Sequence, residues 1–208
     1  MPRTITTDMK KASVLFFNAC GYKEVSFLLL NNPNGLGTDC NFFSVCIVNG
    51  MLASELFLKF LISHDYTTKN KTTTVVFSGI HNINSLYKDL SLATRREIQK
   101  ELLKFGCDKK RFSSFRAQIR RAEDLRSTNK GKNGDAVNWR YLIVPHKSSY
   151  TFDLDTMTKL NEVLYQISRR IINKLSNKIA LPSMESFALD AFSEEIVNKR
   201  YISPFKPN

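Results

Sequence analysis

Residues 41–64 read NFFSVCIVNGMLASELFLKFLISH, an almost wholly apolar stretch. A helix that is apolar on nearly every face is typical of a protein core. Its two central charges, Glu55 and Lys59, lie four residues apart and so on one helix face. Because ionised groups among apolar neighbours are costly unless paired, the pair predicts a polar cluster inside the fold. The simpler alternative is a helix-surface ion pair, which would contribute about 0.2 to 0.5 kcal/mol.

Helical spacing of apolar residues recurs on both sides of this core stretch. Asn82 or Asn84 can cap the helix that follows, and Thr94 to Glu97 fits a capping box for the next one. Residues 72–77 are at most a brief strand. The pattern predicts an all-α bundle over residues 1–180, and a C-terminal helix and tail in 181–208 that pack on the bundle or extend from it. Further helices are predicted at 8–30, 82–90, 94–105, 110–126, 153–177 and 184–199.

Composition narrows the class of protein. The chain has 208 residues, 42% of them apolar, enough for one good core. Its start lacks the apolar segment of a secretory signal, and the charges of Glu55 and Lys59 interrupt the best candidate for a membrane span. We therefore expect a soluble cytoplasmic protein. The four cysteines form no Cys-x-x-Cys pair and have no histidine at metal-ligand spacing, so we expect buried free thiols, no metal site and no cofactor.

Positive charge is concentrated in the middle of the chain. The net charge is +12, and residues 67–180 hold 23 basic against ten acidic residues, whereas the two flanking segments are nearly neutral. Residues 108–132 alone carry nine Lys or Arg, the pattern expected of a phosphate-backbone binder. A solvated face that keeps the protein soluble is the alternative. The predicted phosphate ligands are Lys109, Lys110, Arg111, Arg116, Arg120 and Arg121.

Three motifs occur in a fixed order along the chain. The first is Ala53-x-Glu55-x-x-Leu58-Lys59, the second runs from Gly79 through His81 and Asn82 to Leu86, and the third is Trp139-Arg140-Tyr141. Together they resemble the HEPN domain superfamily. The resemblance implies an up-and-down bundle of four to five helices that frequently dimerises. It also implies roles in RNA cleavage, antiphage defence, toxin systems or nucleotide binding.

The resemblance also suggests catalytic residues. HEPN ribonucleases carry an arginine followed, after four to six residues, by a histidine, and Arg140 and His146 fit with five residues between them. A histidine can accept the 2′-hydroxyl proton of RNA and an arginine can stabilise charge on the phosphate, without a metal. His81 is the other candidate histidine. Glu55, Lys59, Asn82 and Tyr141 are expected to form the polar cluster around this site, in a structural role or as the lining of a pocket.

Three functions follow as hypotheses. The first is a HEPN-like module that binds RNA or a nucleotide, with a protein partner as a further expectation. The second is a metal-independent endoribonuclease that uses the Arg140 site. The third is a non-catalytic assembly domain that acts as a homodimer. Binding is placed first because residues 142–145 are apolar and end in a proline, whereas polar residues usually follow the arginine in catalytic HEPN motifs.

Overall fold

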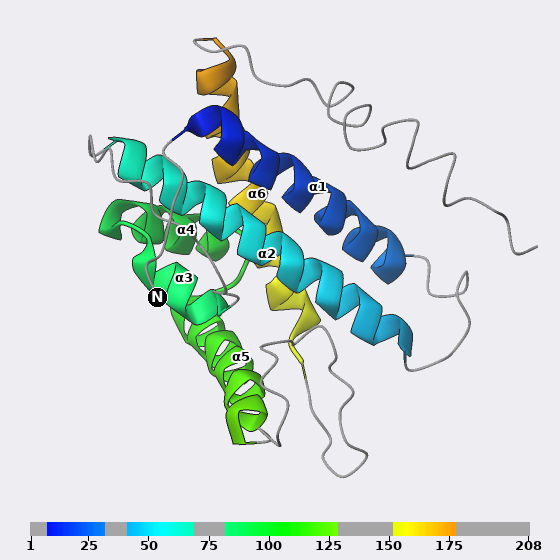
Figure 1. Ribbon diagram of the computed structural model, residues 1–208. Helices are drawn as coiled ribbons and strands as arrows, with labels where there is room; N and C mark the ends of the chain where they lie inside the picture. Colours follow the sequence, from blue (N-terminus) through cyan, green and yellow to red (C-terminus); the bar gives the residue numbers. More distant parts are fainter. Residues whose placement is uncertain (1–7, 32–40, 69–81, 129–151, 178–208) are drawn as a thin grey trace, which may run out of the picture.

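The computed structural model describes residues 8–31, 41–68, 82–128 and 152–177 of the chain. Within these ranges the backbone forms helices and no strand, so the all-α prediction is confirmed (Figure 1). The up-and-down topology that the HEPN resemblance implies stays a prediction. The six helices are α1 (Met9–Asn31), α2 (Asn41–Thr68), α3 (Ile83–Asp89), α4 (Leu92–Lys104), α5 (Lys109–Thr128) and α6 (Leu154–Ser176).

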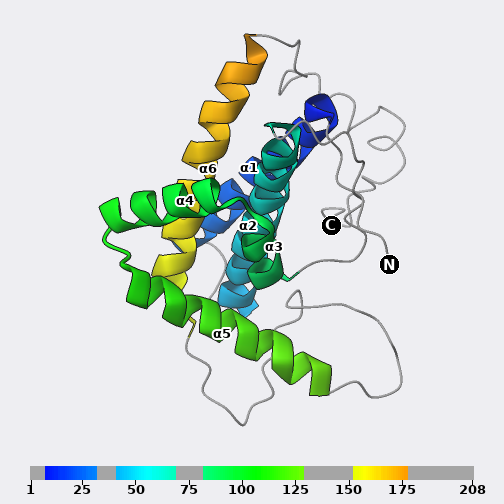
Figure 2. The same cartoon turned by 90° about the vertical axis from the view of Figure 1, so that its left-hand side faces the viewer.

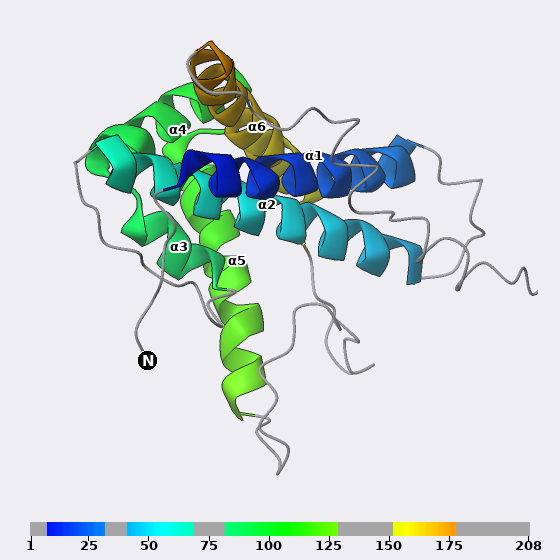
Figure 3. The ribbon, with the colours of Figure 1, turned by 45° about the horizontal axis from the view of Figure 1, so that its top comes forward.

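Helices α1 and α2 form an antiparallel pair that lies side by side along its length (Figures 1 and 3). Ala12 and Ala19 are fully buried on α1, and their small side chains let the two backbones approach closely. Phe16 fills the adjoining space, with its ring 6.0 Å from that of Phe57 and 5.8 Å from that of Phe60. The apolar stretch of α2 is therefore the central helix that its sequence predicts.

Helix α6 packs against α2 at a contact made by small and polar residues. The Asn161 amide donates to the Gly50 carbonyl oxygen at 2.8 Å, and the Ser54 hydroxyl donates to the Asn161 amide oxygen at 2.6 Å. A Cβ atom at Gly50 would lie 2.5 Å from the Met157 methyl group, so this buried side chain would have to move to make room for it.

Helices α3, α4 and α5 form a second layer beside the α2 and α6 helices (Figure 2). Helix α4 ends at Lys104, and Gly106 beyond it has a φ of +70°, the left-handed conformation that glycine adopts without strain. The amides of Gly106 and Cys107 donate to the carbonyl oxygens of Leu103 and Leu102, which is a Schellman motif. The helix predicted over 94–105 thus ends within one residue of its predicted end.

The predicted cap of α3 and the predicted start of α6 agree with the structure, whereas the predicted start of α4 does not. Asn82 caps α3 by accepting from the Ser85 amide at 2.8 Å, and Asp153 caps α6 by accepting from the Thr156 amide at 2.9 Å. The capping box at Thr94 is wrong, because Ser91 caps α4 and accepts from the Thr94 amide at 3.1 Å. Helix α4 therefore begins two residues before its predicted first residue.

Two helices meet the length and hydropathy of a membrane span, which differs from the expectation that no stretch of the chain does. They are α1 and residues 45–68 of α2. Most of the α2 window is buried inside the fold, as in the core helix of a soluble protein, whereas most of the α1 window is not. Length and composition alone are weak evidence for a membrane, so the expected cytoplasmic location stays a prediction.

The cysteines that the structure describes are free thiols, as predicted. Cys46 and Cys107 are buried and Cys20 is half-buried, and burial raises the pKa of Cys20 to about 11. A thiol with so high a pKa is largely protonated and unreactive at neutral pH. Cys40 lies outside the described residues, as do the predicted strand at 72–77, the predicted helix at 184–199 and the whole of 181–208.

Candidate nucleic-acid interface

The charged pair on the central helix is buried. The Lys59 ammonium lies 2.5 Å from a Glu55 carboxylate oxygen, and the two residues are only 8% and 2% exposed. The alternative of a helix-surface ion pair is therefore wrong. The expected cluster partners His81, Arg140 and Tyr141 lie outside the described residues.

The predicted catalytic residues stay predictions. His81, Arg140 and His146 all fall within ranges that the structure does not describe. Asn82 is described, and its side-chain oxygen caps α3. Among the described residues, no group of three His, Cys, Asp or Glu side chains is placed to hold a metal ion.

Arg111 has acidic partners within the fold. Its guanidinium donates twice to Asp153, at 3.0 and 3.1 Å, and lies 2.8 Å from an Asp155 carboxylate oxygen. Burial opposes the charge on Asp153, but hydrogen bonds from Arg111 and Thr156 outweigh it and lower the pKa of Asp153 to about 2. Arg111 therefore joins α5 to the start of α6, and most of its charge is already matched.

The other predicted phosphate ligands on α5 differ in their surroundings. Lys109 and Lys110 are exposed at the start of the helix, beside the bound Arg111. Arg120 is exposed two turns after Phe112, and its side chain has no acidic partner in the described part of the chain. Only the backbone of Arg121 is described. Of these residues, Arg120 is the one that lies next to a further concentration of positive charge.

That concentration is centred on Tyr87 of α3, where Arg116 stacks. The Arg116 guanidinium lies 4.5 Å from the centre of the Tyr87 ring, a cation–π contact. Its Nε donates to the Asn84 side-chain oxygen at 3.0 Å, while the Asn84 amide donates to the Arg116 carbonyl oxygen at 3.2 Å. These contacts hold the guanidinium in one place, yet both partners are neutral, so its charge is not cancelled.

Arg95 of α4 brings a third guanidinium to this place, and sequence reasoning missed it. The Tyr87 hydroxyl, which accepts from Gln99 at 3.2 Å, lies 3.5 Å from the Arg95 carbonyl oxygen. The Arg95 Nε is buried and has no hydrogen-bond partner among the described residues. The only sequence signal was the pair of arginines in the first turns of α4, which a solvated helix would carry equally well.

We call Arg95, Arg116 and Arg120 the arginine cluster. Burial lowers the pKa of Arg116, and the nearby charges of Arg120 and Arg95 also lower it. Arginine keeps its proton at neutral pH all the same, so three positive charges repel one another on this surface. No carboxylate whose side chain the structure describes, which leaves out Glu123 and Asp124, forms an ion pair with any of the three. An anion bound between them would relieve that repulsion, and planar guanidinium groups suit phosphate oxygens well.

A scan against protein-family models, a search of curated proteins and a search of solved structures each found no match to this chain.

Proposed function

We propose that this protein binds the phosphate backbone of RNA through the arginine cluster. The observation that carries the proposal is that Arg95 and Arg116 lie beside Tyr87, with Arg120 near Arg116, and that none of the three forms an ion pair with a carboxylate whose side chain the structure describes. Of the carboxylates on α4, Glu97 pairs with Arg170 and Glu101 with Lys104, so neither is bound to an arginine of the cluster. The positive charge of this face is therefore available to an external anion.

Binding of this kind would depend little on base sequence. Tyr87 is only 4% exposed and its ring is covered by Arg116 and Phe112, so it offers no open face on which a base could stack. Contacts would be to phosphates, which position a nucleic acid without reading its bases. The HEPN resemblance favours RNA as the polymer, and a homodimer in a cytoplasmic defence or toxin system as the setting.

The salt dependence of RNA binding tests the proposal. For a single strand, the logarithm of the binding constant falls with the logarithm of salt concentration by about 0.7 for each phosphate contacted. Three contacts therefore predict a slope of about −2 between about 50 and 200 mM salt. The measurement is fluorescence anisotropy of a labelled oligouridylate with the full chain. In Arg120→Gln, the slope should become shallower by about 0.7.

A matched control variant separates the effect of losing a charge at the arginine cluster from the effect of lowering the total charge of the protein. Arg169 is exposed on α6 and lies near Cys20 of α1, so Arg169→Gln removes the same charge elsewhere. It should leave the slope unchanged. Equal effects of the two variants, or affinity indifferent to salt, would contradict the proposal. Uridine monophosphate is added at the same phosphate concentration as the RNA. If it displaces the RNA completely, the ligand of the arginine cluster is a nucleotide and not the RNA polymer.

A further inference from the structure

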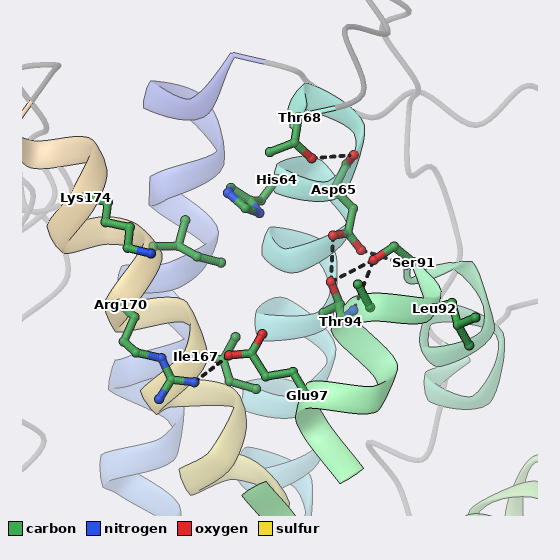
Figure 4. A pocket seen from close by; sticks show the side chains of 12 residues that line it. His64, Asp65, Thr68, Ser91, Leu92, Thr94, Glu97, Ile167, Arg170 and Lys174 are labelled. Atoms are coloured by element: carbon green, nitrogen blue, oxygen red, sulfur yellow. Dashed lines mark hydrogen bonds and ion pairs between the residues drawn. The ribbon is translucent and has the colours of Figure 1, made fainter. Parts of the chain in front are cut away.

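A cleft of about 580 Å³ lies where the end of α2, the start of α4 and the end of α6 meet (Figure 4). Sites for small molecules are usually about 300 to 1,000 Å³ in volume. One wall is polar and includes His64 and Thr94, and another is apolar and includes Ile167 and Ile171. None of the arginine cluster lines this cleft, so it is a separate place on the molecule.

The cleft contains two carboxylates, and each has a partner. Asp65 accepts hydrogen bonds, and Glu97 forms an ion pair. Asp65 accepts from the Ser91 amide at 2.7 Å with one oxygen and from the Thr94 hydroxyl at 2.7 Å with the other. It is thereby held at the amino-terminal end of α4, where negative charge is stabilised. Glu97 pairs with Arg170 across the cleft at 2.7 Å. Glu97 is therefore paired with a cation, whereas the hydrogen-bond donors to Asp65 are neutral groups.

Two basic side chains of the cleft have no such partner in the described ranges. Lys174 projects from α6 and His64 from α2, and Figure 4 shows them pointing toward one another across the opening. Neither forms a hydrogen bond or ion pair with any described residue. Apart from His64, the cleft holds two carboxylates and two cations, and Lys174 is the cation that forms no ion pair with a described residue.

The pKa of His64 lies below its ordinary value of 6.5, so its surroundings disfavour the imidazolium. Burial lowers its pKa, and the Lys174 ammonium lowers it further, while Asp65 and Glu97 oppose that change. Arg170 is the remaining charged group that lines the cleft. An anion placed between His64 and Lys174 would reverse the balance, because it would favour the imidazolium.

We propose that this cleft binds a small organic anion, with Lys174 and His64 holding its charged group and Ile167 and Ile171 covering its carbon skeleton. The site does not depend on RNA binding by the arginine cluster. A free phosphate or carboxylate compound of this size would fit the same chemistry, and the two head groups are separated by experiment.

The test uses phenyl phosphate and benzoate as probes, with benzyl alcohol as their neutral counterpart. The His64 ring signal is followed by nuclear magnetic resonance and assigned by its loss in His64→Gln. At least one anion should bind saturably and raise the pKa of His64, while benzyl alcohol does neither. The better anion identifies the preferred head group. Lys174→Gln should weaken binding at least about tenfold, the effect of losing one hydrogen bond to a charged group.

The matched control is Lys100→Gln, which removes an exposed charge from α4 away from the cleft. It should bind the anion as the unchanged protein does. Equal binding of benzyl alcohol, equal binding by Lys174→Gln, or an unmoved His64 signal with both anions would overturn the proposal. RNA affinity should be the same in Lys174→Gln, so failure of this site is distinguishable from failure of the arginine cluster.

Discussion

The two helix layers, α1, α2 and α6 on one side and α3, α4 and α5 on the other, each hold a lysine–glutamate pair. The two pairs differ in how far they are exposed to solvent. On α2, a lysine and a glutamate form a pair that the fold buries almost completely. On α4, Lys104 and Glu101 form a pair whose lysine is 58% exposed. The first pair is removed from solvent, whereas the second keeps its lysine in solvent. The comparison teaches that a basic residue in this chain must be judged by the layer that holds it.

The largest expected effect comes from breaking the buried pair. Lys59→Met leaves the Glu55 carboxylate without its closest cation in the core, which costs about 3 to 5 kcal/mol in the free energy of unfolding. Urea denaturation followed by circular dichroism measures it. The double variant Glu55→Gln with Lys59→Met should be more stable than Lys59→Met alone, because neither member of the pair is then charged.

The exposed pair supplies the control for that prediction. Lys104→Met removes the same chemical groups from α4 and should shift the urea midpoint far less than Lys59→Met, since the Lys104 ammonium lies in solvent, which screens the pair. If Lys104→Met were as destabilising as Lys59→Met, the distinction between the two layers would be wrong.

A smaller effect is expected where α2 and α6 touch. Gly50→Ala places a Cβ atom 2.5 Å from the Met157 methyl group and 2.6 Å from its sulfur, so the helices must shift or Met157 must adopt another rotamer. Overpacking of this kind costs about 1 to 3 kcal/mol. Gly21→Ala is its control, because nothing lies within 4 Å of the added Cβ. On helix propensity it should gain about 0.5 to 1 kcal/mol in the same denaturation experiment.

The smallest effect concerns Asp153, which joins the two layers by its pair with Arg111. Its folded pKa of about 2 lies below the ordinary value of 3.8, so the unfolded chain takes up this proton first as the pH falls. The stability it contributes is complete above pH 3.8 and is lost as the pH falls toward 2. Asp153→Asn should lower Tm by about 2 to 4 °C at neutral pH and flatten this acid limb of the Tm profile. An unchanged acid limb would contradict the assignment.

Sequence reasoning succeeded where a pattern is local. The spacing of apolar residues located all six helices, and Asn82, Gly106 and Asp153 marked ends that the structure confirms. Each of these signals lies within one turn of the feature it predicts, which is why the residues alone were sufficient.

It failed where a distant residue decides the outcome. Thr94 is not the cap of α4, because Asp65 of α2 accepts its hydroxyl and the Ser91 amide together. Arg111 is not an unmatched phosphate ligand, because it pairs with Asp153 and Asp155. Both carboxylates lie more than 40 residues further along the chain, beyond the reach of a local pattern. Arg95 joins Arg116 only through the packing of α3 between them. No local spacing reports such pairings.

Gly106 has a consequence for the arginine cluster. The cluster draws Arg95 from α4 and Arg116 from α5, and the turn at Gly106 sets the direction in which the second helix leaves the first. Its left-handed backbone is the region that a D-amino acid prefers and an L-side chain resists. The relative orientation of Arg95 and Arg116, on a surface proposed to bind a chiral polymer, therefore depends on a turn at the achiral residue Gly106.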